Sequence, residues 1–190
     1  SDLNHYIRKG NPKATKCVYV VHRLDQATSG LMVFAKTEKA QQFLKNNWSK
    51  MKKNYLTLVH GHLKNKSGLI ESYLQEDEDY HVHSSQDNSQ GKLAKTEYTV
   101  IKESENISAI KINLLTGKKN QIRVHMAENK TPVLGDDKYG AKISKVKELM
   151  LHAYRLNLIH PYSNETFEIT SPIPLRFQKI IDLKDVEKYL

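Results

Sequence analysis

The 190-residue sequence predicts an α+β fold with a mixed, mainly antiparallel central β-sheet and flanking helices and loops. Several short apolar runs follow one another with only polar, turn-like residues between them, which favours antiparallel pairing of neighbouring strands. Only a few segments repeat apolar residues at three- and four-residue steps, the spacing of amphipathic helices. No internal repeat and no low-complexity tract occurs, so we expect a single domain over residues 1–190.

A polar corner interrupts the first part of the chain. Residues 2–10 are expected to form a short capped helix, and the apolar run at residues 17–21 is short enough for a buried strand. The sequence HRLDQATSG follows at residues 22–30, and residues 30–36 form a second short apolar run. Two strands are therefore predicted, one on each side of this corner.

The remaining elements follow from periodicity. Over residues 38–52 apolar side chains recur at helical steps, for example at Ala40, Leu44 and Trp48, with a lysine-rich outer face. Side chains alternate between two faces over residues 55–63, as in a strand. Further strands are predicted at residues 68–74, 96–101, 107–115, 149–159 and around Phe167, and helices at residues 121–128 and 175–190.

The charge balance indicates a polyanionic partner. The chain carries 30 Lys and Arg against 21 Asp and Glu, a formal net charge of +9, and such a basic excess is typical of nucleic-acid-binding proteins. The single cysteine, Cys17, has no internal disulfide partner, which favours a reducing cytoplasm. No apolar run approaches the roughly 20 residues that cross a bilayer, and no signal-peptide pattern is present, so no membrane association is expected.

The corner concentrates polar side chains between two strands, namely His22, Arg23, Asp25, Thr28 and Ser29. Polar groups in such loops often bind ligands or perform chemistry. An Asx-type turn, in which Asp25 accepts backbone N–H groups and the two hydroxyls satisfy others, explains the same composition. The corner taken alone leaves both interpretations open.

Motifs along the chain favour the interpretation that the polar corner performs chemistry. HRLDQATSG resembles the H-R-L-D-x-x-T-S-G signature of the RluA family of pseudouridine synthases, which isomerise uridine in RNA. Similar segments follow in the family's order: K-x-Y at residues 53–55, TGKKNQIRVH at 116–125, PVLGDDKYG at 132–140 and LHAYRL at 151–156. The resemblance covers about residues 18–177 and implies the catalytic core of that family.

The resemblance implies a cofactor-free isomerase in which Asp25 is the essential aspartate. The reaction breaks the bond between the uracil nitrogen and the ribose, turns the base and rejoins it through carbon. Whether Asp25 adds to the ribose, adds to the base or removes a sugar proton stays open. Each route needs an ionised carboxylate, and burial favours the neutral acid, so a cation must lie beside it. Arg123 has the family position for that cation, and a guanidinium can grip a carboxylate bidentately.

Other site residues also follow from the resemblance. Tyr55 matches the active-site tyrosine, whose ring offers a stacking face for a flipped pyrimidine and whose hydroxyl could transfer a proton. Leu151 matches the residue that closes the apolar side of the base pocket, although a core role explains it nearly as well. Arg23 resembles a residue that enters the RNA beside the extracted base. The other residues expected to bind substrate or RNA are His22, Thr28, Lys53, Lys118, Lys119 and Asn120.

Three positions depart from the family pattern. Lys118 and Asn120 stand where Arg and His are common, and Lys130 stands where glycine usually precedes the proline. We expect these changes to alter RNA contacts without removing the chemistry. The family's early strand with its lysine-proline-glycine motif is missing, so residues 1–190 are expected to lack that first strand and any N-terminal RNA-binding module.

Two other functions compete with this interpretation. A catalytically silent RNA-binding protein on the same scaffold is the main alternative, because fold does not guarantee activity. A hydrolase built from His22, Asp25 and Ser29 is the second, although the strained G-x-S-x-G elbow is absent.

Two pairs of histidines raise the question of a metal site, and the partners of the chain are a separate question. His60 and His62 share a predicted strand face, as do His81 and His83 if that segment is extended, but no second cysteine and no acidic ligand stands at a diagnostic spacing. We therefore predict no metal and no cofactor. The expected partner is structured ribosomal or transfer RNA, bound by a monomer without an obligate protein partner.

Overall fold

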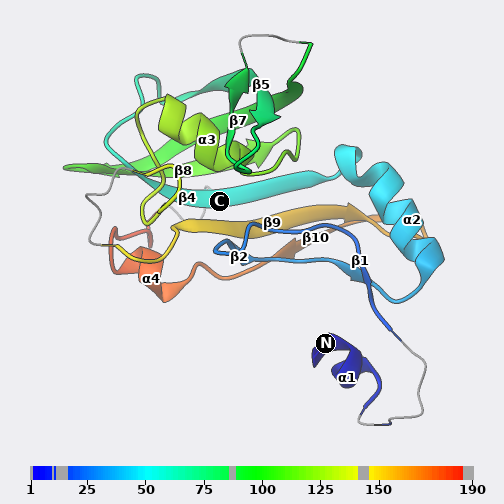
Figure 1. Ribbon diagram of the computed structural model, residues 1–190. Helices are drawn as coiled ribbons and strands as arrows, with labels where there is room; N and C mark the ends of the chain where they lie inside the picture. The colour runs from blue at the N-terminus through cyan, green and yellow to red at the C-terminus, as the bar shows by residue number, and fades with distance from the viewer. Residues whose placement is uncertain (1, 10, 12–16, 86–88, 141–145, 186–190) are drawn as a thin grey trace.

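Figure 1 shows the chain as a computed structural model, which describes residues 2–9, 11, 17–85, 89–140 and 146–185. The elements in these residues are, in chain order, α1 (Asp2–Ile7), β1 (Tyr19–Val20), β2 (Ser29–Gly30), β3 (Phe34–Ala35), α2 (Glu38–Asn47), the 3-10 turn η1 (Trp48–Lys50), β4 (Lys52–His60), β5 (Ser67–Glu76), β6 (Val82–Ser85), β7 (Lys92–Ser104), β8 (Ile107–Leu114), α3 (Gln121–Glu128), β9 (Leu151–Ile159), β10 (Thr166–Thr170) and α4 (Leu175–Gln178).

An eight-stranded sheet organises the chain. Its main order is β10-β9-β4-β8-β7-β5-β6, and all neighbours along this path pair antiparallel. The two-residue strand β2 joins β9 in parallel, with Ser29 opposite His152 and Gly30 opposite Ala153. The predicted α+β class with a mixed, mainly antiparallel sheet is therefore confirmed.

The central strand β4 sends alternate side chains into two apolar clusters. Tyr55 and Val59 lie in a cluster with Ile122 of α3, whereas Leu56 and Leu58 lie in a second cluster with Phe177 of α4. The two helices accordingly lie on opposite faces of the sheet (Figure 1). Both leucines are fully buried, and burial of such a side chain contributes roughly 1.5–3 kcal/mol.

A third apolar cluster joins α2 to the sheet. Leu44 of α2 packs there with Met51 and with Leu156 of β9. The helix begins after Thr37, whose hydroxyl accepts a hydrogen bond from the Ala40 N–H at 3.1 Å, a typical N-terminal cap. This helix places the following 3-10 turn and the start of β4 next to the polar corner.

The strands expected around the corner are shorter than predicted. The run at residues 17–21 contributes only β1, which pairs with β3 through Tyr19 and Val20. The run at residues 30–36 is divided, because Gly30 pairs with β9 while Phe34 and Ala35 pair with β1. Tertiary pairing to a distant strand has broken a run that reads as one strand in the sequence.

Several predicted boundaries were also wrong. The helix expected over residues 38–52 ends at Asn47, and Lys52 belongs to β4 because it pairs with Asn157 of β9. The first helix ends at Ile7, and position 10 of its predicted range lies outside the described residues. The closing helix is α4 alone, and residues 186–190 also lie outside the description.

The strand β6 was not predicted. It is short, and only Val82 of its four residues is buried, so its apolar signal is weak. It pairs with β5, with Tyr73 opposite Ser85 and Glu76 opposite Val82. Among the described residues, no helix has the length and apolar character needed to cross a membrane.

Candidate active site

The polar corner is fastened to β9 by a close backbone approach at Gly30. This glycine has φ +116°, and a Cβ atom there would lie 2.2 Å from the carbonyl oxygen of Ala153. The Leu31 N–H donates to that same carbonyl at 2.9 Å. Ser29 extends the attachment, because its hydroxyl lies 2.8 Å from Nδ1 of His152 and accepts a hydrogen bond from Arg176 at 2.5 Å. Only glycine fits this position, and the corner is held in one place.

The carboxylate of Asp25 is left available by this arrangement. Leu24 packs against the apolar cluster that contains Tyr55 and Leu151, which turns the next residue toward the site. The Asp25 carbonyl accepts the Thr28 N–H at 2.9 Å and closes a backbone turn. Within the described residues, the Asp25 carboxylate itself accepts no hydrogen bond, so the Asx-type turn is not formed, and the side chain is 24% exposed.

Arg123 of α3 lies beside this carboxylate. Its Nη1 is 3.8 Å from Oδ2 of Asp25, and its side chain is 9% exposed. The predicted neighbourhood of the acid and the guanidinium is therefore present. The expected bidentate grip on Asp25 is not: Nε and Nη2 of Arg123 donate to the two carboxylate oxygens of Asp136 at 2.8 and 2.6 Å.

Asp136 is a site residue that the sequence reasoning missed. Its side chain is fully buried, and its Oδ1 also accepts the backbone N–H groups of Lys138 and Tyr139 at 3.0 and 2.9 Å. The preceding Gly135 has φ +72°, and a Cβ there would lie 1.9 Å from the carbonyl oxygen of Glu148. The motif PVLGDDKYG contained the signal, but nothing in its spacing showed that this acid would bind Arg123.

The electrostatics of the cluster keep Arg123 charged. Burial alone would lower the pKa of Arg123, but the hydrogen bonds and negative charge of Asp136, with the charges of Asp25 and Tyr139, raise that pKa above its ordinary value. Asp137 lies 3.6 Å from the same guanidinium with its side chain almost fully exposed. One fixed cation therefore faces three carboxylates, of which Asp25 has the longest distance to the guanidinium.

Tyr55 of β4 lies near the carboxylate of Asp25. It is 8% exposed and shares an apolar cluster with Leu151, which is 2% exposed. Burial and then the negative charge of Asp25 raise the pKa of Tyr55 to about 12. The phenol of Tyr55 therefore stays protonated at neutral pH. The apolar wall at Leu151, the aromatic ring of Tyr55 and the carboxylate of Asp25 lie together.

Tyr139 connects Arg123 to the rest of the wall. Its ring centroid lies 5.2 Å from the guanidinium carbon of Arg123, within cation–π range. Its hydroxyl donates to Oδ1 of Asn120 at 3.3 Å and accepts the Val82 N–H at 3.0 Å. Asn120 is 8% exposed with φ +53°, so this predicted RNA-binding residue is turned into the wall.

Two residues expected to touch RNA are turned inward instead. Lys53 is 4% exposed, and its ammonium donates to the carbonyls of Trp48 and Met51 at 3.0 and 2.7 Å, so in this structure it faces the interior of the fold. The His22 ring stacks on Trp48 at 4.4 Å, and its Nε2 accepts the Val33 N–H. Burial lowers the pKa of His22, which keeps the ring neutral in its acceptor role. The side chains of Lys53 and His22 therefore bind backbone groups of the fold and help to hold the polar corner in position.

The other predicted RNA-binding residues lie nearer the surface. Arg23 and Lys119 are exposed and Lys118 is half-buried. Lys119 forms an ion pair with Glu76. The hydroxyl oxygen of Thr28 is buried without a hydrogen-bond partner within the described structure. Within the described residues, Arg23 and Lys118 form no ion pair.

The pocket for a base beside Asp25 remains a prediction. A polar hollow of about 410 Å³ is lined by residues of five strands, namely Lys52, Asn54, Glu97, Tyr98, Thr99, Lys111, Asn113, Arg155, Asn157 and Glu168. None of the predicted site residues contributes to its wall. The side chains of the hydrolase alternative likewise make no hydrogen bond with one another within the described residues, since Ser29 binds His152 and His22 binds the backbone of Val33.

Sequence comparison connects this geometry to known proteins. A family profile described as RNA pseudouridylate synthase matches residues 3–128. A Mycoplasma pneumoniae protein named "Uncharacterized RNA pseudouridine synthase MG209 homolog" is 36% identical, over 87% of this chain and 55% of that protein. The "Dual-specificity RNA pseudouridine synthase RluA" of Yersinia pestis is 38% identical, over 74% of this chain and 71% of that protein.

Longer relatives and solved structures are also similar. The "Ribosomal large subunit pseudouridine synthase D" of Pasteurella multocida is 34% identical over 86% of this chain. The chain spans about 55% of the length of that protein and of the Mycoplasma relative. The structure of "Human RNA Pseudouridylate Synthase Domain Containing 4" superposes with a TM-score of 0.79 at 20% identity, over 95% of this chain and 80% of the human one, which shows a shared fold.

Proposed function

The chain belongs to the RNA pseudouridylate synthase family, and from this premise we propose that it isomerises uridine to pseudouridine in RNA, with Asp25 as the acting carboxylate. The observation that carries the proposal is the 3.8 Å approach of Arg123 to Asp25, in a wall where Arg123 is fixed by Asp136. Residues 1–190 act in this proposal as one catalytic domain. The names of the relatives favour ribosomal RNA as substrate, with transfer RNA as the alternative.

The proposed chemistry needs a persistent anion. The N-glycosidic bond of uridine breaks, the uracil turns in the site and a carbon–carbon bond to the ribose forms. The proton on that base carbon leaves, and the ring nitrogen released from the ribose gains a proton. Asp25 serves as nucleophile or as base in this sequence, and in either role it must be ionised when RNA arrives. Within the described part of the chain the Asp25 carboxylate accepts no hydrogen bond, which supports this role because no backbone group there competes for its oxygens.

Arg123 supports the charge of Asp25 from a fixed position. An isolated pair at about 4 Å is worth about 4 kcal/mol at an effective dielectric constant near 20. The value here is smaller, since Arg123 also neutralises Asp136 and lies close to Asp137. We infer that Asp136 orients the guanidinium of Arg123. The longest of its three carboxylate contacts is then the one with Asp25, the proposed reacting group.

Tyr55 and Leu151 form the proposed wall for the base. A uridine in structured RNA must leave its stack to reach Asp25, and an aromatic ring compensates for the lost stacking. Because the pKa of Tyr55 is about 12, its hydroxyl is a hydrogen-bond donor to the base at neutral pH. Arg23 and Lys118 are proposed phosphate contacts outside this wall. We further propose that the protein works in the cytoplasm as a monomer.

The test is product analysis with ribosomal and transfer RNA transcripts. Wild-type protein forms pseudouridine, whereas Asp25→Asn binds the same RNA with unchanged affinity and forms product at least about 10²–10⁴-fold more slowly. Asp137→Asn is the matched control, because it removes the same charge from an exposed neighbour of Arg123. Turnover by Asp25→Asn at the wild-type rate contradicts the assignment. RNA binding by the wild type without any product, on the RNA of its own source cell, supports the silent RNA-binding alternative instead.

A further inference from the structure

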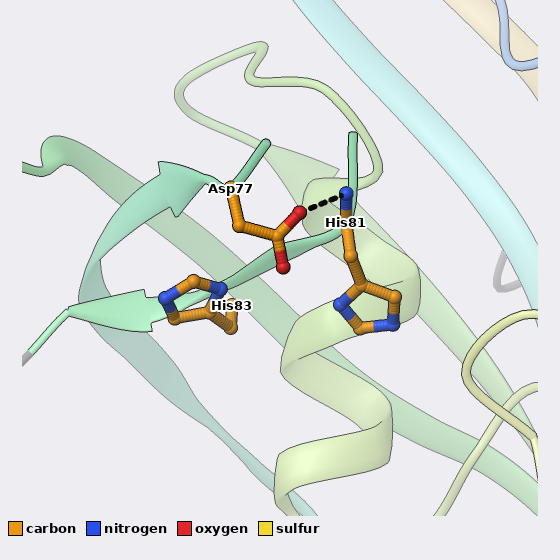
Figure 2. A group of neighbouring side chains, drawn as sticks. All are labelled: Asp77, His81 and His83. Carbon is orange, nitrogen blue, oxygen red and sulfur yellow. Dashed lines mark hydrogen bonds between the residues drawn. The ribbon is translucent and has the colours of Figure 1, made fainter. Parts of the chain in front are cut away.

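The β5–β6 hairpin gathers three metal-binding side chains outside the proposed active site. Asp77 follows the last residue of β5, His81 directly precedes β6, and His83 is the second residue of β6. One ligand atom from each of the three lies within 4.8 Å of the others, and Figure 2 shows the Asp77 carboxylate between the imidazole rings of His81 and His83. The sequence analysis considered His81 and His83 but predicted no metal, because it identified no acidic ligand at a diagnostic spacing; the folded hairpin brings the Asp77 carboxylate to them.

The local fold places these groups on one side. Val82 is buried, so its neighbours His81 and His83 point to the opposite, exposed side of the strand. The turn is closed by hydrogen bonds from Asp77 N–H to the His81 carbonyl at 2.9 Å and from His81 N–H to Oδ1 of Asp77 at 2.7 Å (Figure 2). Tyr80 completes it with φ +59°. The backbone therefore fixes the origin of all three side chains.

The ligand atoms are available to a cation. Oδ1 of Asp77 is used by the backbone N–H groups of His81 and Asp79, which orients the carboxylate and leaves Oδ2 without a hydrogen bond within the described residues. The ring of His83 likewise makes no hydrogen bond there. Side-chain rotations suffice to close the remaining distance, since Asp77 and His83 are exposed.

We propose that Asp77, His81 and His83 bind a zinc ion, with water in the fourth position. Two imidazoles and one carboxylate match the ligand preference of Zn²⁺, whereas Mg²⁺ and Ca²⁺ prefer oxygen ligands alone. Bonds of about 2.0–2.1 Å in a tetrahedron separate ligand atoms by about 3.3 Å. The present separations are therefore those of an open site that contracts when the ion binds.

The surrounding charge favours a cation in spite of the basic chain. Glu76, Asp77, Glu78 and Asp79 are consecutive, and their basic neighbours are Lys119 and Lys138. Lys119 is already paired with Glu76, and Lys138 donates to the Tyr80 carbonyl at 2.6 Å. The acidic groups outnumber the basic ones at this turn, so a divalent cation relieves their mutual repulsion.

The zinc site is linked to the wall of the proposed active site. The His81 ring lies 4.5 Å from the ring of Tyr139, whose other contacts include Arg123 and the Val82 N–H. A bound ion ties together both ends of the turn on which that wall rests. Zinc binding itself does not depend on the proposed isomerase activity, so either proposal can fail without the other.

The experiment is a Zn²⁺ titration of the whole chain in competition with a chromophoric chelator. Wild-type protein binds one ion tightly, and Asp77→Asn and His83→Gln each weaken that binding by at least about tenfold, since even indirect ligand supports are worth about 10–100-fold in affinity. Glu78→Gln removes an equal charge from the same turn, and His5→Gln removes an exposed imidazole elsewhere; both bind Zn²⁺ as wild type does. Excess Mg²⁺ does not displace the ion.

Other outcomes overturn the proposal. Equal weakening by Asp77→Asn and Glu78→Gln would mean that the turn only attracts cations through charge. Unchanged binding in both ligand variants would place the ion at other histidines. Hydrogen exchange of residues 77–83 provides a second readout, because Zn²⁺ slows exchange there in wild type and not in His83→Gln.

Discussion

Asp136 holds Arg123 through both carboxylate oxygens, at 2.8 and 2.6 Å, with the acid fully buried. Breaking a buried ion pair by removing one partner costs about 3–5 kcal/mol, because the remaining charge is left without compensation. We therefore expect Asp136→Asn to lower the free energy of unfolding by about that amount in urea titrations. Asp137→Asn, at an almost fully exposed neighbour, should change it by no more than about 0.5 kcal/mol.

A double variant separates stability from activity at the same pair. Arg123→Met with Asp136→Asn removes both charges of the buried pair, so neither is left uncompensated, and the amide oxygen can still accept the N–H groups of Lys138 and Tyr139. We expect this protein to fold with stability near wild type and to form no pseudouridine. An active, stable double variant would show that Arg123 is not needed beside Asp25.

Removing the charge of Asp25 should lower the pKa of Tyr55. The negative charge of Asp25 contributes to the raised pKa of about 12, after burial, because it opposes ionisation of the nearby phenol. In Asp25→Asn this repulsion is gone, so Tyr55 ionises at lower pH. Carbon-13 NMR of labelled tyrosine, titrated upward from neutral pH and assigned with Tyr55→Phe, measures the difference. Equal pKa values in the two proteins would place the acid too far from the ring.

Salt dependence distinguishes lysines that touch RNA from lysines that support the fold. Each phosphate contact contributes about 0.7–0.9 to the slope of log affinity against log salt. Lys118→Gln should reduce the slope by about that amount. Lys53→Gln should leave the slope unchanged and lower stability, because its ammonium binds two backbone carbonyls inside the fold. A reduced slope in Lys53→Gln would restore Lys53 to the RNA interface.

Stability should fall as the pH is lowered from about 6.5 toward 4. Burial lowers the pKa of His125 from 6.5 to about 4, and burial followed by the charge of Arg176 does the same for His152. Between these values the unfolded chain binds more protons than the folded one, so the free energy of unfolding rises with pH. For the fully buried His125 the whole difference corresponds to up to about 3 kcal/mol.

Urea unfolding at pH 7.5 and pH 5 measures this loss. In His125→Gln the difference between the two pH values should be smaller than in wild type, since one of the two histidines no longer titrates. The glutamine can still bond to Thr96 or Ser72, the present partners of the ring. Identical pH dependence in both proteins would show that His125 is not the source.

Local sequence signals predicted much of the fold because most elements have unambiguous periodicity. Helix α3 has the predicted bounds, and β4 was predicted from its alternation between two buried faces. The strand run at residues 30–36 was misjudged, since its division depends on the contact of Gly30 with β9, more than 120 residues away. Such pairing leaves no local trace in the sequence.

The candidate site shows the same limit at the level of side chains. Asp25, Arg123 and Tyr55 were expected to lie together, and the structure brings them together. Which carboxylate binds Arg123 bidentately depended on the loop at Asp136, and which way Lys53 points depended on the end of η1. Composition supplies candidate groups, whereas tertiary packing decides which of them pair with one another.

The attachment of the corner to β9 also sets an order of assembly. Ser29 and His152 lie 123 positions apart, and contacts over such separations form slowly because of the chain entropy that they cost. During synthesis Asp25 leaves the ribosome before β9 and Arg176, to which the corner is attached. A nascent chain therefore carries the polar corner before it carries the strand that fixes the position of that corner, so the corner is ordered only after β9 has been made.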